Sequence, residues 1–145
     1  MTVMTATELQ DFLAREFPQV SGLNLRIEEA RDRYVRVRMP FDDQHLRPGG
    51  TVSGPAMMTV ADCSVYLAIL ATLGGVAQAV TTNLNANFLS RPEPKDIVAE
   101  ARIIKLGRRL AFGEVDIFSE GVVEPVAHVT ATYAIPDGGR EATES

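Results

Sequence analysis

An aspartate lies in the middle of one of the most apolar stretches of the chain. The stretch SGPAMMTVADCSVY covers residues 53–66, and Asp62 is its only charged residue. A carboxylate is costly to bury without a partner, so packing alone seldom explains an Asp at such a position. A carboxylate held in an apolar groove can act as a general base toward water or as a nucleophile. Asp62 is therefore the first candidate for a catalytic residue.

The same stretch begins with residues that start a helix. Ser53 is a suitable N-cap, and Pro55 fits the first turn, where its missing N–H costs nothing. Free N–H groups and the positive end of the helix dipole lie at this end. A carbonyl oxygen placed against the Gly54 N–H would be polarised, and an oxyanion formed there would be stabilised. The alternative is that Gly54 only gives a tight entry to the helix and Ser53 only caps it.

Three neighbours of Asp62 also carry functional groups. Thr59 and Tyr66 lie three residues before and four residues after it, on one helical face, so they are candidates for hydrogen-bonding its carboxylate. Residues at such positions are more often core or interface residues. Cys63 is the next residue and points about 100° away from Asp62, so we interpret it as a small buried hydrophobic residue.

Composition limits the classes of function. The net charge of −5 argues against a nucleic-acid partner. One cysteine excludes an intramolecular disulfide, and with only two isolated histidines the composition argues against a metal site. The N-terminal residues lack the pattern of a signal peptide, and the longest apolar run is too short and too interrupted for a membrane span. We therefore expect a cytoplasmic protein that needs no metal or other cofactor and does not bind membranes.

The pattern along the chain predicts one α+β domain. A capping box and helical spacing of apolar residues predict a helix over Ala6–Glu16, and Ser53 and Gly74-Gly75 delimit a long buried helix that ends near Leu73. Alternating patterns predict two strands, or one kinked strand, over 23–40, and a Gly- and Pro-rich loop over 41–52. Further strands are expected over 77–89, 96–105, 110–119 and 125–135. Such a sheet would curl around the apolar helix.

In this order of elements, and in its motifs, the chain resembles the PaaI-like (phenylacetate-pathway type) acyl-CoA thioesterases of the hotdog fold. The helix Asp in TVAD, the glycine that opens the helix, and the hydroxyl in VTTNLNANF match the family pattern, which places its catalytic groups at Asp62, Gly54 and Thr81. The downstream Asn and aromatic residue match Asn85 and Phe88. The chain departs from the pattern in two places: the family's His-Gly-Gly is SGP here, and its loop Asn is Arg47.

The resemblance implies a complete functional hypothesis. The substrate would be an aryl or short- to medium-chain acyl-CoA, and the site would lie between the subunits of a homodimer or of a dimer of dimers. CoA itself is part of the substrate. Basic residues at the Gly-Arg-Arg turn and in the loops are candidates for its phosphates, because Arg offers a bidentate fork. The candidates for phosphate binding are Arg47, Arg91, Lys95, Lys105, Arg108 and Arg109, of which the Arg108-Arg109 pair is the strongest. Arg47 is also a candidate for other substrate contacts, together with Ser53, Met58 and Tyr66.

The expected boundaries are an N-terminal helix over 1–20, a hotdog domain over 21–136 and a disordered tail over 137–145. Two alternatives to hydrolysis stay open. A hotdog dehydratase would pair a His with the helix carboxylate, but His45 lies 17 residues before Asp62, in a loop without the dehydratase pattern. A non-catalytic acyl-CoA binding protein is the stronger alternative, because the SGP stretch replaces the family's His-Gly-Gly.

Overall fold

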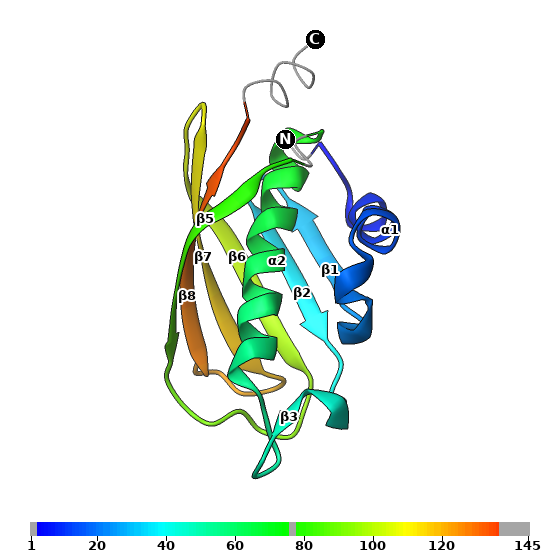
Figure 1. Cartoon of the computed structure of the whole chain (residues 1–145), viewed down its shortest axis with the longest axis vertical. Helices are drawn as coiled ribbons and strands as arrows, with labels where there is room; N and C mark the ends of the chain where they lie inside the picture. Colours follow the sequence, from blue (N-terminus) through cyan, green and yellow to red (C-terminus); the bar gives the residue numbers. More distant parts are fainter. Residues whose placement is uncertain (1–2, 76–77, 137–145) are drawn as a thin grey trace.

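The computed structural model describes residues 3–75 and 78–136, which form a curved sheet around one long helix (Figure 1). The sheet is antiparallel and has six strands in the order β1-β2-β6-β7-β8-β5. The helices are α1 (Ala6–Glu16) and α2 (Gly54–Leu73), with 3₁₀ turns η1 (Pro18–Leu23) and η2 (Asp43–His45); the strands are β1 (Arg26–Arg31), β2 (Tyr34–Met39), β3 (Leu46–Arg47), β4 (Thr51–Val52), β5 (Val80–Phe88), β6 (Ile97–Leu106), β7 (Leu110–Ser119) and β8 (Ala127–Ala134). This arrangement confirms the α+β prediction of a single hotdog domain.

Helix α2 forms the centre of the core because it is apolar almost all round. Its residues from Met57 to Ala71 are mostly buried against the concave face of the sheet. The helix is long and apolar enough to cross a membrane, yet 67% of its most apolar window is buried inside the fold, as in a core helix. Ser53 caps it, since its Oγ accepts a hydrogen bond from the Ala56 N–H at 3.2 Å. Gly74, at φ 72°, ends it.

Close packing of α2 on the sheet depends on a glycine of β7. A Cβ on Gly113 would lie 3.2 Å from Cγ1 of Val65 and 3.0 Å from the carbonyl oxygen of Arg102. Because real side chains do not fit such distances without a shift, the missing side chain lets α2 approach the sheet here. A larger residue at position 113 would therefore force α2 or its neighbours to shift.

The structure differs from three local predictions in their boundaries or details. Pro18–Leu23 is a 3₁₀ turn, and β1 begins only at Arg26, because Asn24 adopts a left-handed conformation (φ 53°) that interrupts an extended strand. The predicted strand pair turns at Asp32 and Arg33, slightly later than its sequence pattern indicated, and both strands form. The loop over 41–52 contains η2 and the small hairpin β3–β4, which two-residue strands do not reveal in a sequence. The start of the predicted strand 77–89 and the tail 137–145 lie partly or wholly outside the described residues.

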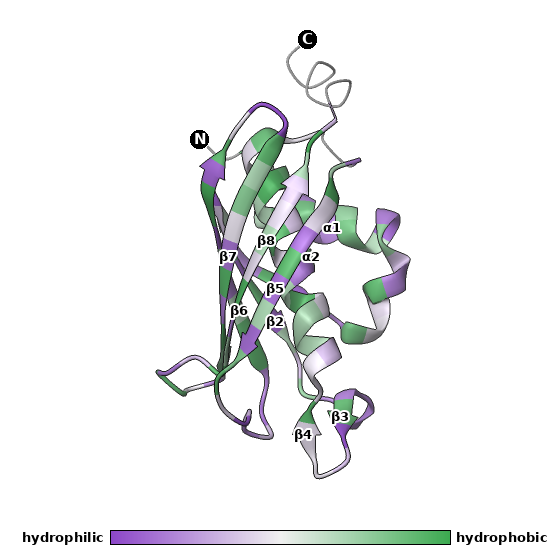
Figure 2. Ribbon diagram, turned by 60° about the vertical axis from the view of Figure 1, so that its left-hand side comes forward, coloured by the Kyte–Doolittle hydropathy of each residue, from purple (hydrophilic) through white to green (hydrophobic). Residues whose placement is uncertain are grey.

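Strand β5 lies at the edge of the sheet, and its residues are almost all exposed (Figure 2). Its pairing with β8 contains an irregularity between Thr81 and Asn83, where one extra residue shifts the register. A bulge of this kind reverses which face each side chain reaches. Beyond it, Leu84 and Ala86 point toward the core side of the sheet, opposite the buried residues of β8.

Candidate active site

The carboxylate of Asp62 lies at the centre of a small hydrogen-bonded group. Thr81 donates from Oγ1 to Oδ1 of Asp62 at 2.8 Å, and the hydroxyl of Tyr133 lies 2.7 Å from the same oxygen. The Tyr133 hydroxyl is also 2.9 Å from the backbone carbonyl oxygen of Asp62. These contacts explain how a carboxylate is accommodated on so apolar a helix.

The bulge in β5 brings Thr81 to this group. Regular alternation from Leu84 back along the strand would place Thr81 on the outer face of the sheet. The extra residue instead pairs Thr81 with Tyr133, an inward-facing residue of β8 that is 3% exposed. Both hydroxyls therefore approach Asp62 from adjacent strands.

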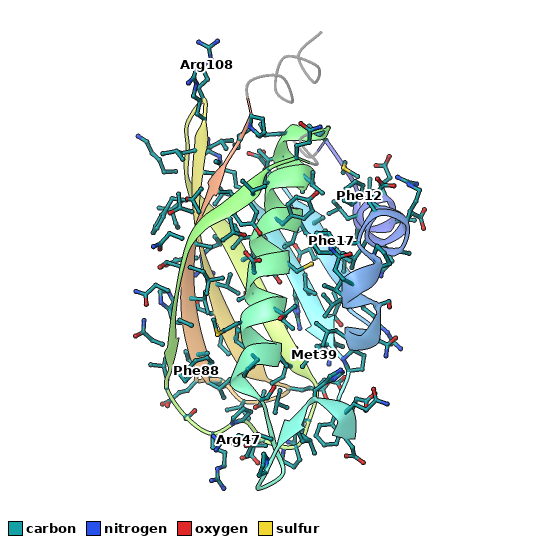
Figure 3. The ribbon with its side chains drawn as sticks, viewed as in Figure 1. Phe12, Phe17, Met39, Arg47, Phe88 and Arg108 are labelled. Carbon is teal, nitrogen blue, oxygen red and sulfur yellow. The ribbon has the colours of Figure 1, made fainter. Side chains whose placement is uncertain are left out.

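Aromatic rings hold Tyr133 in place. Its ring stacks on that of Tyr66, with centroids 6.1 Å apart and planes 25° apart. Tyr66 in turn contacts the rings of Phe12 and Phe17 at 6.2 and 5.6 Å, which links the N-terminal helix to the carboxylate (Figure 3). Burial raises the pKa of Tyr66 to about 12. Burial is also the main cause of a still higher pKa for Tyr133, with a smaller contribution from the charge of Asp62, so its hydroxyl is a neutral donor.

Thr59 and Cys63, which lie close to Asp62 in the sequence, do not contribute to its hydrogen-bonded group. The hydroxyl of Thr59 donates to the carbonyl oxygen of Pro55 at 3.0 Å, so the predicted bond from Thr59 to the carboxylate is not formed. Cys63 is 4% exposed, and burial, with a smaller effect of the Asp62 charge, raises the pKa of its thiol to about 12. A neutral buried thiol is no nucleophile, which agrees with the interpretation of Cys63 as a core residue.

The N-terminal end of α2 borders a cavity of about 460 Å³. Gly54 and Ser53 line it, together with Phe88 at the end of β5 and the basic residues Arg47 and Arg91. The ring of Phe88 covers Gly54, since a Cβ on that glycine would lie 3.4 Å from Cζ of the ring. The cavity therefore combines helix N–H groups, an aromatic wall and two positive charges.

Within one chain, the carboxylate and this cavity are separate. Asp62 follows Gly54 by eight residues, which corresponds to about 12 Å along the helix axis. The turn that carries Arg108 and Arg109 lies at the opposite end of the molecule from Arg47 and Phe88 (Figure 3). A single chain thus brings together only part of the predicted site.

The other two predicted substrate contacts, Met58 and Tyr66, differ in exposure. Met58 is 39% exposed, whereas its neighbour Met57 lines the cavity. Tyr66 is 5% exposed and lies in the core behind the carboxylate. Over residues 3–75 and 78–136, no group of three or more His, Cys, Asp or Glu side chains is placed to hold a metal ion.

Comparison with known proteins identifies the family. The model of the thioesterase superfamily matches residues 49–126, which is just over half of the chain. The chain belongs to this superfamily. Human acyl-coenzyme A thioesterase 13 is 30% identical over 115 residues, which cover 79% of this chain and 81% of the human protein. The enzyme is therefore a thioesterase.

Solved structures agree with this placement. A protein from Silicibacter sp. TM1040 assigned as a thioesterase has 42% identity and a TM-score of 0.84, with 94% of each chain covered. The PaaI protein of the Escherichia coli phenylacetic acid degradation operon has 17% identity and a TM-score of 0.79, covering 90% of this chain and 93% of that one. At that identity the likeness shows the shared fold.

The sequence did not single out Tyr133, although a signal for it was present. The alternation in AHVTATYA places this residue on the inner face of its strand, where a tyrosine hydroxyl needs a polar partner. Asp62 is the carboxylate on the apolar helix that the sheet surrounds. Pairing these two unsatisfied groups would have predicted their contact.

Proposed function

We propose that this thioesterase hydrolyses an acyl-CoA, with an aryl or short- to medium-chain acyl group, to the free acid and CoA. The observation that carries the proposal is the carboxylate of Asp62, which two hydroxyls from β5 and β8 hold in place. Asp62 lies on the helix whose N-terminus borders a cavity with two arginines. The name of the human relative supports the acyl-CoA class.

The residues are suited to two related reaction courses. In the first, Asp62 takes a proton from water, and the resulting hydroxide attacks the thioester carbonyl. The Gly54 N–H stabilises the oxyanion, whose collapse breaks the C–S bond and expels the CoA thiolate, which is then protonated. In the second, Asp62 attacks the carbonyl itself and forms a mixed anhydride, which water hydrolyses. Both yield one carboxylic acid and one thiol per water consumed.

The cavity supports binding of the CoA portion. Arg47 and Arg91 are both exposed at its rim, in a chain whose net charge is −5, so they form a local positive site for phosphate. The hydroxyl of Ser53 caps the helix by accepting a hydrogen bond from the Ala56 N–H, so the Gly54 N–H can bind the substrate.

A two-fold axis through β5 would complete the site. Asp62 is bonded to Thr81 near one end of this edge strand, and Gly54 is covered by Phe88 at the other end. Antiparallel pairing of β5 with its copy, about an axis near Leu84, would place the partner's Thr81 end beside the Phe88 end of this chain. The carboxylate of one subunit would then face the helix N-terminus of the other. An exposed edge strand is suited to such pairing.

The same symmetry accounts for the distant arginines. Because the two chains would run in opposite directions across the axis, the end of the partner that carries Arg108 and Arg109 would lie at the same end of the dimer as Gly54 and Arg47. These arginines would thereby come to the side of the dimer where CoA enters. A dimer of dimers is compatible with this arrangement.

The first experiment compares wild type with Asp62→Asn in thiol release from a panel of acyl- and aryl-CoA esters. The Asn variant keeps the shape of the side chain and removes its charge, so we expect a loss of rate of roughly 10³-fold or more with little change in thermal stability. Binding of CoA esters by both proteins, without turnover by either, would favour the non-catalytic binding protein. Full activity in Asp62→Asn would exclude its role as base or nucleophile.

A second experiment tests the shared site. Asp62→Asn and Gly54→Pro are each expected to be inactive as homodimers, and each still contains the group that the other lacks. Mixed dimers would contain one intact site, so co-refolding equal amounts should restore about a quarter of wild-type activity. Mixing Asp62→Asn with itself is the control. No restoration in proven mixed dimers would place both groups in a site within one chain.

A further inference from the structure

Two hydroxyls approach the same oxygen of the catalytic carboxylate. Thr81 Oγ1 and Tyr133 Oη lie 2.8 and 2.7 Å from Oδ1 of Asp62. A carboxylate oxygen that accepts two hydrogen bonds is fixed in place and has a reduced capacity to accept a further proton. The two oxygens of Asp62 are therefore not equivalent.

We propose that Tyr133 is a positioning residue of the reaction. Together with Thr81, it holds Oδ1 of Asp62, so that Oδ2 is the oxygen that takes the proton from water or attacks the thioester. This inference rests on the proposed function and adds to it which of the two carboxylate oxygens reacts and which is held in place. It also gives Thr81 a defined task, because its hydroxyl proton is donated to the carboxylate.

The position of Tyr133 fits this task better than a purely structural one. Its ring is 3% exposed and stacked on Tyr66, so the hydroxyl has a fixed direction. The hydroxyl lies 2.9 Å from the backbone carbonyl oxygen of Asp62 as well as 2.7 Å from its side chain, and so spans the residue. Phenylalanine would fill the same space in the core. A buried hydroxyl destabilises the fold unless it forms a hydrogen bond, so the hydroxyl of Tyr133 needs its partner.

A series of ring contacts connects Tyr133 to the N-terminal helix. Phe12 and Phe17 cover Tyr66, and Tyr66 covers Tyr133. This series of rings runs from outside the segment 49–126 matched by the family model into the site. The direction of the carboxylate is thus set by residues well separated in the sequence, which tertiary packing brings together.

The test is Tyr133→Phe, which keeps the ring and removes the hydroxyl. We expect kcat to fall roughly 10- to 100-fold, as for loss of a hydrogen bond to a charged group, with KM little changed. The acid limb of the pH–rate profile should move to higher pH, because the ionised carboxylate loses a donor that stabilises it. Tyr34→Phe is the matched control: that hydroxyl donates to Glu100 at 3.1 Å, on a different carboxylate, and its loss should leave kcat and the pH profile unchanged.

A second pair of variants guards against a folding defect. Thr81→Val removes the other donor from an exposed position of β5, and Thr81→Ser returns a hydroxyl. We expect Thr81→Val to lower kcat and shift the acid limb in the same direction, and Thr81→Ser to restore both. Wild-type kcat and an unmoved acid limb in folded Tyr133→Phe, while wild type hydrolyses thioesters, would overturn the positioning role and leave the proposed function intact.

An inactive wild type would overturn the proposed function and the positioning role together. The contact itself is then judged by a thermal-denaturation cycle of wild type, Tyr133→Phe, Asp62→Ala and the double variant. A melting-temperature loss for Tyr133→Phe that disappears in the Asp62→Ala background would mean that the hydroxyl serves only to satisfy the Asp62 carboxylate. Equal losses in both backgrounds would contradict the contact as well.

Discussion

The two ends of β5 border two different halves of the candidate active site. At the Thr81 end, the carboxylate of Asp62 is held by two neutral hydroxyls and backed by stacked rings. At the Phe88 end, Gly54 borders an open cavity with exposed arginines. The first half is held by hydrogen bonds and ring contacts within its own chain, whereas the second half is open and charged. Preorganisation of the reacting group and access for the substrate are thus assigned to opposite ends of one edge strand.

After the loss expected for Asp62→Asn, the largest effect should come from the Phe88 end, through the backbone of Gly54. Gly54→Pro removes the backbone N–H at the first residue of α2, which lines the cavity, but proline suits this helix position, so the fold should survive. Loss of an oxyanion donor is expected to lower kcat roughly 100- to 1000-fold. Gly54→Ala is the control, because it keeps the N–H and its Cβ would sit 3.4 Å from the Phe88 ring, an ordinary contact. Equal rates for the Pro and Ala variants would remove the N–H from the mechanism.

A second prediction contrasts aromatic residues at the two ends. Tyr66→Ala removes a ring that is 5% exposed and should lower the free energy of unfolding by about 3–5 kcal/mol. Phe88→Ala removes a ring that is 48% exposed in one chain, so it should cost about 1 kcal/mol or less in the folding of the subunit. Chemical denaturation at several protein concentrations separates folding from assembly. Similar losses for both variants at low concentration would contradict the described contrast in packing.

The central helix could be predicted from the sequence because its signals are local. Ser53 at the cap, Pro55 in the first turn and Gly74 at the end act within a few residues of the helix boundaries, and α2 begins and ends where they indicate. Asp62 was also recognisable, since a charge in an apolar run stands out without any knowledge of its surroundings.

The partners of Asp62 could not be predicted in the same way. Thr81 reaches the carboxylate only because the bulge after it changes the face on which it lies, and a bulge is decided by strand pairing rather than by the strand's own residues. Tyr133 lies 71 residues from Asp62, so the contact depends on how β8 is placed over α2. The candidate site is thus assembled at the bulge near the start of β5, where the alternation of side chains is interrupted.

A third prediction concerns the charges at the Phe88 end. Replacing both Arg47 and Arg91 by Gln should raise KM for acyl-CoA roughly 10-fold, because each Arg can form charge-assisted hydrogen bonds to phosphate. The effect should shrink at high ionic strength and be absent for an acyl-pantetheine thioester, which lacks the nucleotide phosphates. Arg15→Gln is the control for lost charge, since Arg15 is exposed on α1. An equal rise in KM for the pantetheine thioester would mean that the two arginines do not bind phosphate.

The smallest effect is expected at Cys63, which adjoins the carboxylate but faces the core. Burial raises the pKa of this thiol to about 12, so at pH 7–9 it is neutral and cannot attack a thioester. Cys63→Ala should retain kcat and lose only about 1 kcal/mol of stability from the smaller side chain. In the folded wild type, alkylation by a maleimide at pH 8 should be slow and should become fast in denaturant. Rapid modification of the native protein with loss of activity would show that the carboxylate end is less closed than its packing indicates, and the contrast between the two ends of β5 would then have to be redrawn.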